Sequence, residues 1–129
     1  MGKRVIAGGA LLAAQLLTVT WAVAGPWEDG MAAYNRGDYL PAIQLIRPLA
    51  AAGNAKAQSV LGIMYRKGQG VTKSVPHAFM WLSLASAQGD AKAKADMAEM
   101  SRTMSAEELA QAREMMRACE ASDYRNCEY

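Results

Sequence analysis

The sequence has few of the residues from which most active sites are built. Among its 129 residues there is one histidine, His77, and there are two cysteines, both near the end of the chain. A general base needs a nucleophile and an oriented partner within reach, and the sequence places neither beside His77. We therefore interpret His77 as a helix-surface residue, and we expect no catalytic residue, no cofactor and no enzymatic activity.

The sequence also lacks a surplus of basic charge outside its first residues. Lys and Arg number 14 against 12 Asp and Glu. The two signs therefore balance once Lys3 and Arg4 are set aside with the segment described next. A neutral chain with interspersed charges has neither the basic stripe of a nucleic-acid-binding protein nor the polybasic cluster that binds an anionic membrane surface. We expect no nucleic acid partner, and a protein or peptide partner instead.

Long apolar runs are missing except at the N-terminus. There Lys3 and Arg4 precede an apolar run over residues 5–23, and Ala22-Val23-Ala24 has the small-x-small pattern of a signal-peptide cleavage site. We predict a signal peptide at residues 1–24, cleavage between Ala24 and Gly25, and a periplasmic or secreted mature domain at residues 25–129. An uncleaved anchor is the alternative, because a bilayer span needs roughly 20 apolar residues. In that case the N-terminal segment would be the only contact with the membrane.

The two cysteines, Cys119 and Cys127, are interpreted in the light of export. An oxidising compartment favours a disulfide between them, whereas two thiols without a nearby histidine do not complete a four-ligand zinc site. We predict a disulfide, with metal ligation as the alternative, and no metal site elsewhere. A loop this short contributes on the order of 2–3 kcal/mol to stability, which is useful to a domain whose total is about 5–15 kcal/mol.

An internal repeat is the strongest positive signal. The stretch Gly53-Asn54-Ala55-Lys56-Ala57 matches Gly89-Asp90-Ala91-Lys92-Ala93, and the 36-residue period between them is typical of helical-hairpin repeats. Glycine accepts the left-handed backbone just past a helix, and Asn or Asp caps the next helix. Each matching stretch is therefore predicted to be a corner between two helices.

Apolar residues recur at helical spacing between these corners, and no segment has the alternation of a strand. Ser105 and Glu108 form a capping box that begins the last helix. This helix is predicted to close the open end of the stack. The predicted helices cover residues 27–36, 39–52, 54–67, 75–88, 90–102 and 106–121. The fold class is thus all-α, with antiparallel helical hairpins stacked as a short α/α solenoid that ends in a C-terminal capping helix.

One repeat resembles a known family. Its signature residues are Ala57-Gln58, Leu61-Gly62, Tyr65, Gly68-Gln69-Gly70-Val71, Ala78, Trp81, Ala85 and Gln88-Gly89. Together they resemble a full Sel1-like repeat, a tetratricopeptide-like unit with a longer loop between its two helices, as found in exported bacterial proteins. The resemblance implies a short tetratricopeptide-like unit at about residues 30–53, the full repeat at 54–89, and terminal helices with a disulfide-tied tail at 90–129.

The motif also has a physical basis. Gly62 lacks a side chain and so permits close approach of the paired helix, while Tyr65 and Trp81 bury large areas. Residues of this kind are expected to hold the repeats together. They are Tyr34, Gly37, Gly53, Leu61, Gly62, Tyr65, Gly68, Gly70, Val71, Ala78, Trp81, Ala85 and Gly89.

The leading functional hypothesis is an interaction module. In helical solenoids the first helices of the hairpins line a concave surface that receives a peptide or a partner helix. The expected exposed contributors are Ser59, Ile63, Arg66 and Lys67. An adaptor or scaffold role in the cell envelope follows. The alternatives are a cell-envelope hydrolase acting on peptidoglycan or a β-lactam, for which no nucleophile and base are in view, and a structural assembly subunit.

Overall fold

The computed structural model describes residues 2, 23–125 and 127. Within these residues there are six helices and no strand. They are α1 (Pro26–Arg36), α2 (Tyr39–Ala51), α3 (Ala55–Lys67), α4 (Val75–Ala87), α5 (Ala91–Ser101) and α6 (Ala106–Ala121). The predicted all-α fold is confirmed, and every predicted helix end lies within one residue of the observed one.

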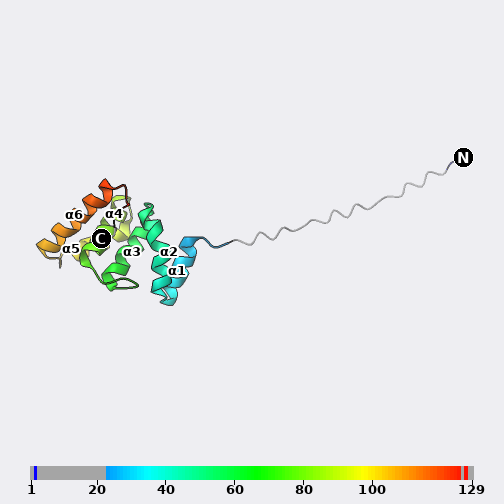
Figure 1. Cartoon of the computed structure of the whole chain (residues 1–129), viewed down its shortest axis with the longest axis horizontal. Coiled ribbons are helices and arrows are strands. Elements are labelled where there is room, and N and C mark those ends of the chain that lie inside the picture. The colour runs from blue at the N-terminus through cyan, green and yellow to red at the C-terminus, as the bar shows by residue number, and fades with distance from the viewer. Residues whose placement is uncertain (1, 3–22, 126, 128–129) are drawn as a thin grey trace.

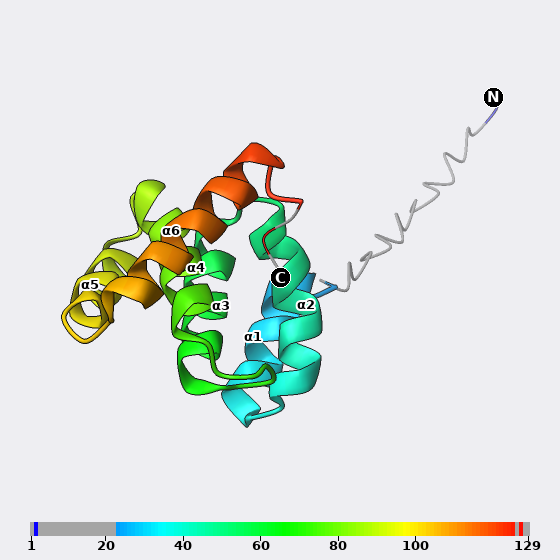
Figure 2. The same cartoon turned by 60° about the vertical axis from the view of Figure 1, so that its left-hand side comes forward.

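The helices are arranged as successive antiparallel hairpins. α1 packs against α2, and α3 packs against α4. α2 contacts α3, which joins the first hairpin to the second, and α4 contacts both α5 and α6. Figures 1 and 2 show α1 and α2 at one end of the molecule, α5 at the other, and α3 and α4 between them. This is the short solenoid that the repeat predicted.

The predicted signal peptide lies outside the described residues except for residues 2, 23 and 24. Val23 and Ala24 are exposed and precede α1 without regular structure. Among the six helices of the described chain, none is long and apolar enough to span a bilayer.

Both predicted corners have the same geometry. Gly53 and Gly89 adopt φ angles of 92° and 94°. Asn54 then accepts a hydrogen bond from the Ala57 N–H at 3.0 Å, and Asp90 accepts the equivalent bond from Ala93 at 2.8 Å. The two near-identical pentapeptides therefore form the same turn, and these turns lead into α3 and α5.

The centre of the core is α4, which is buried on most of its surface because α3, α5 and α6 surround it. A helix covered on several sides must be apolar nearly all round, and α4 has this composition. Trp81 and Leu82 are completely inaccessible to solvent. Most of the other residues expected to hold the repeats together are buried with them, among them Leu61, Tyr65, Ala78 and Ala85.

The approach of α3 to α4 is closest at Gly62. A Cβ atom added there would lie 2.8 Å from Cγ of Leu82 and 3.1 Å from the backbone oxygen of Ala78. Real Cβ atoms essentially never come within 3.0 Å of another heavy atom. The absence of a side chain at Gly62 is therefore what allows the second hairpin to close.

Gly70 fixes the long loop in the same way. Its φ angle is 71°, and an added Cβ would lie 2.6 Å from the backbone oxygen of Tyr39. Any other residue would be strained by its backbone and would collide with the start of α2. The loop therefore lies directly against the first hairpin.

A buried amide links three helices at the other end of the hairpins. The Gln58 side chain is inaccessible to solvent and donates to the Ala50 carbonyl at 3.2 Å. Gln88, which follows α4, donates to its Oε1 at 2.7 Å. Because both ends of the amide are satisfied, its burial fixes the relative positions of α2, α3 and α4 without an unpaired polar group.

The C-terminal end is fastened as predicted. Ser105 and Glu108 form both bonds of the capping box. Cys119, at the end of α6, is joined to Cys127 by a disulfide, with Cα atoms 4.4 Å apart, and both residues are buried. The disulfide holds the segment after α6 against the body of the protein.

We predict that Gly62→Ala destabilises the protein. In a helix interior, alanine is normally more stable than glycine by about 1 kcal/mol. Here the added methyl group overpacks the α3–α4 contact, which costs about 1–3 kcal/mol. Urea unfolding followed by circular dichroism measures the net change. In the double variant with Leu82→Ala, part of the collision is removed and the added methyl should cost less. An unchanged or raised free energy of unfolding in the single variant would contradict the close-approach account.

Candidate functional site

Helices α1 and α3 and the start of α5 meet at an open hollow of about 240 Å³. We call it the first-helix hollow. It is lined by Trp27 of α1, by Lys56, Ser59, Val60 and Ile63 of α3, and by Asp90 and Lys92 at the start of α5. No second helix of a hairpin contributes to this lining, so the hollow lies on the side of the solenoid where a concave binding surface was expected.

The hollow has apolar walls and a charged rim. Trp27, Val60 and Ile63 are half-buried, whereas Lys56 and Lys92 are exposed. Trp27 and Lys56 also line a second hollow of about 550 Å³, which extends past the Gly53–Asn54 corner to Gln88. The two hollows are therefore neighbours, with Trp27 and Lys56 between them.

The four residues predicted to contact a partner have different positions. Ile63 lines the first-helix hollow. Arg66 lies beyond it and pairs with Glu99 of α5 at 3.3 Å, and it lines a separate hollow of about 230 Å³ with Lys73 and Met100. Lys67 is exposed at the end of α3 and lines neither hollow.

The expectation that Ser59 is exposed is wrong. Its exposed fraction is 6%, and it lies in the lining of the first-helix hollow. The helical spacing of α3 alone does not show that Trp27 of α1 and Asp90 and Lys92 at the start of α5 lie beside this face. Ser59 therefore lines the hollow from within.

Five lining residues were not predicted: Trp27, Lys56, Val60, Asp90 and Lys92. Lys56 and Val60 could have been predicted from the sequence. They lie on the same face of α3 as Ile63, at spacings of four and three residues. Trp27 belongs to α1 and Asp90 caps α5, and only the packing of the helices brings them to α3.

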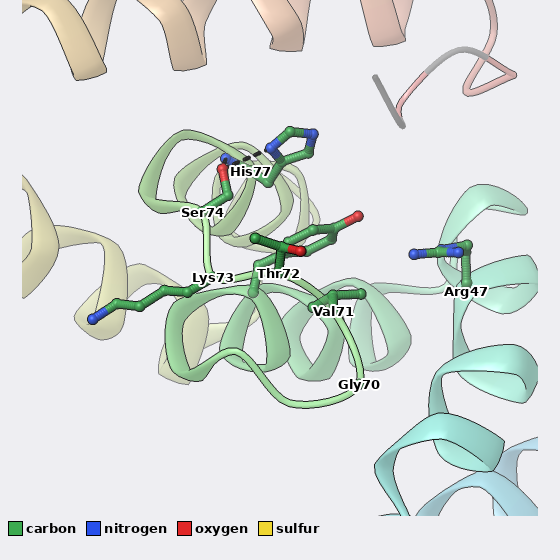
Figure 3. Close-up of a pocket in the computed structure, with 8 residues that line it drawn as sticks. Arg47, Gly70, Val71, Thr72, Lys73, Ser74 and His77 are labelled. Atoms are coloured by element: carbon green, nitrogen blue, oxygen red, sulfur yellow. Dashed lines mark hydrogen bonds between the residues drawn. The ribbon is translucent and has the colours of Figure 1, made fainter.

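A larger hollow of about 830 Å³ lies beside the long loop, and we call it the loop hollow. Figure 3 shows Arg47 of α2 on one side, with Val71, Thr72 and His77 on the other. The His77 ring is half-buried and stacks on Tyr65 with centroids 4.8 Å apart.

The loop hollow contains a serine and a histidine in contact. Ser74 Oγ lies 2.7 Å from Nδ1 of His77, and the same oxygen accepts the His77 backbone N–H at 3.4 Å (Figure 3). Ser74 is the N-cap of α4, so this contact joins residues three apart at a helix start. Ser74 thus has a structural role at the start of α4.

The described residues also contain no candidate metal site. No three His, Cys, Asp or Glu side chains there come together closely enough to hold an ion. The two cysteines are joined to each other.

Comparison with known proteins identifies the central hairpin. Residues 55–90 match the family model described as the Sel1 repeat. The matched span contains α3, the long loop and α4, and it ends at the Asp90 cap of α5. It coincides closely with the full repeat predicted at residues 54–89. No curated protein matches the chain.

We predict that Ser74→Ala lowers the free energy of unfolding by about 1 kcal/mol, because the first turn of α4 loses its cap. Ser74→Asp is the matched control. Aspartate caps helices as well as serine does, so this variant should stay within a few tenths of a kcal/mol of the wild type. Chemical unfolding measures both. Equal losses in the two variants would show that Ser74 does something other than capping.

Proposed function

We propose that this protein, whose residues 55–90 match the Sel1 repeat, is an interaction module whose first-helix hollow binds a protein partner. Sel1 repeats are in general protein-interaction modules. The observation that carries the proposal is the lining of the hollow, which comes from α1, α3 and the start of α5 together. A surface assembled from three helices that are far apart in the sequence exists only in the folded stack, and it offers apolar walls that solvent reaches.

The composition of the hollow suits a partner surface. Protein interfaces combine an apolar centre, often with an aromatic residue, with a polar rim. Here Trp27, Val60 and Ile63 supply the centre, and Lys56 and Lys92 supply the rim. The stack is short, so the hollow provides one anchoring point, and a second contact from oligomerisation or a larger complex would strengthen binding.

We further propose that the protein acts in the cell envelope after export, as an adaptor or scaffold formed by residues 25–129. The disulfide is of the kind that persists in oxidising compartments. The predicted cleavage site lies where Val23 is 91% exposed and the chain has no regular structure, which is the form of backbone that proteases cut. Cleavage there would leave α1 intact, since it begins at Pro26.

The alternatives receive less support from the site. A hydrolase would need a nucleophile with an oriented base, and the one Ser–His contact in the loop hollow caps a helix. An assembly subunit would need an exposed apolar patch. In the described chain after residue 23, Leu40 is the one large hydrophobic residue that is strongly exposed, at 63%, and single exposed residues of this kind are normal.

We predict that affinity capture from the native envelope, with crosslinking and mass spectrometry, yields a discrete partner that Ile63→Asp loses. A charge in the hollow has to be desolvated when a partner binds, which weakens the complex severely. Arg113→Asp on α6 is the control, since Arg113 is exposed and does not line the hollow, and it should retain the partner. The same spectra should place the N-terminus of the natural protein at Gly25.

A partner that binds both variants equally would place the binding surface elsewhere. A natural N-terminus ahead of residue 23 would instead support an uncleaved anchor, and it would leave the assignment of the hollow unaffected.

A further inference from the structure

We propose that the loop hollow is the docking site of the chain's own residues Glu128 and Tyr129, and that the Cys119–Cys127 disulfide holds them there. The first-helix hollow plays no part in this inference, since the two hollows share no lining residue. The proposal is drawn from the charge of the loop hollow, from where the segment after α6 lies, and from the short reach of two residues beyond a buried cysteine.

The loop hollow has a basic wall. Arg47 on α2 is half-buried, and none of the described residues that line the hollow is acidic. Lys73 also lines it, but this lysine is shared with a neighbouring hollow that includes Glu108. Arg47 is therefore the cation that belongs to the loop hollow alone. A guanidinium binds a carboxylate through two parallel hydrogen bonds, so the hollow suits an acidic occupant.

The remaining lining suits an aromatic side chain next to that carboxylate. The Tyr65 and His77 rings are stacked with centroids 4.8 Å apart, and Val71 is half-buried in the same lining. Aromatic rings pack well on other rings and on aliphatic side chains. An acidic residue followed by an aromatic one matches both parts of the hollow, and the sequence after the last cysteine is Glu128-Tyr129.

The segment after α6 lies beside this hollow. Figures 1 and 2 both show it next to the C-terminal end of α2, the helix that carries Arg47. In Figure 3 the coloured part of the same segment runs above Arg47. The His77 ring nitrogen that does not face Ser74 points to that side of the hollow. The chain after α6 thus leads toward the loop hollow.

Cys127 fixes where the two residues start. It is 2% exposed, and its Cα lies 4.4 Å from that of Cys119 in α6. Two residues span at most about 7 Å even when fully extended, so Glu128 and Tyr129 stay close to the buried cysteine. The volume of the hollow, about 830 Å³, is in the range of pockets that enclose small-molecule ligands, about 300–1,000 Å³. Two side chains therefore fit.

Photo-crosslinking of the purified full chain tests the placement. The photoreactive residue p-benzoylphenylalanine replaces Tyr129, and mass spectrometry maps the crosslinks after irradiation. They should fall on residues 70–77 and on the α2 peptide that contains Arg47. The control carries the same photoreactive residue in place of Arg113, which is exposed on α6, and it should give no crosslink to the loop hollow.

Two sets of substitutions separate the charge from the disulfide. If Glu128 meets Arg47, their substitutions are not additive. Glu128→Gln and Arg47→Gln should each lower the urea midpoint, and the double variant should fall no further than Arg47→Gln alone. Glu120→Gln, an exposed control on α6, should add its effect in full. In the photoreactive chain, alanine at both cysteines should remove most crosslinks to the hollow while circular dichroism shows the helices intact.

Three results would overturn the proposal. The first is crosslinks from position 129 that fall outside the hollow or join two copies of the chain. The second is full additivity of Arg47→Gln and Glu128→Gln. The third is a melting temperature of the wild type that inorganic phosphate raises and Arg47→Gln makes insensitive to phosphate, because the hollow would then be open to an outside anion. None of these results bears on the first-helix hollow, which partner capture with Ile63→Asp tests separately.

Discussion

The close approach of α3 to α4 at Gly62 is the constraint on which the rest of the structure depends. With no Cβ at this position, α3 lies directly against Leu82 and the backbone of Ala78. α4 is thereby held at the centre, where α5 and α6 also pack on it. A wider separation at this point would open the core around Trp81, which is fully buried. The geometry of the central hairpin therefore fixes where the neighbouring hairpins can lie.

Hydrogen bonds at the hairpin ends position the helices that line the proposed binding surface. Gln58 joins the end of α2 to Gln88 after α4, and the capped corners at Asn54 and Asp90 begin α3 and α5. These bonds bring the N-terminal ends of the first helices to one side of the stack, where the first-helix hollow forms. α4 and α6 supply core contacts, and α6 carries the disulfide. The first helix of the repeat, α3, therefore lines the hollow, whereas the second helix, α4, packs in the core.

Sequence reasoning succeeded where the cause is local and failed where it is not. The helix ends were predictable because they are set by local capping interactions. These involve glycine, asparagine, aspartate and the Ser105–Glu108 capping box, whose partners lie within a few residues in the sequence. The Cys119–Cys127 pair was predictable because the chain offers no other cysteine. The burial of Ser59 and the participation of Trp27 were not predictable, since both depend on how one hairpin lies against the next. The contact of Ser74 with His77 was a local event that sequence reasoning missed, although a serine three residues before the ring at a helix start was the available signal.

The central claim is that a partner binds across the N-terminal ends of α1, α3 and α5. Hydrogen exchange of the protein alone and in complex with its captured partner, followed by mass spectrometry, tests this claim directly. The account predicts slower exchange in peptides that cover residues 25–31, 54–63 and 90–93, with no change in the peptides of α6. Protection confined to the loop hollow or to α6, with unchanged exchange in the first helices, would contradict it.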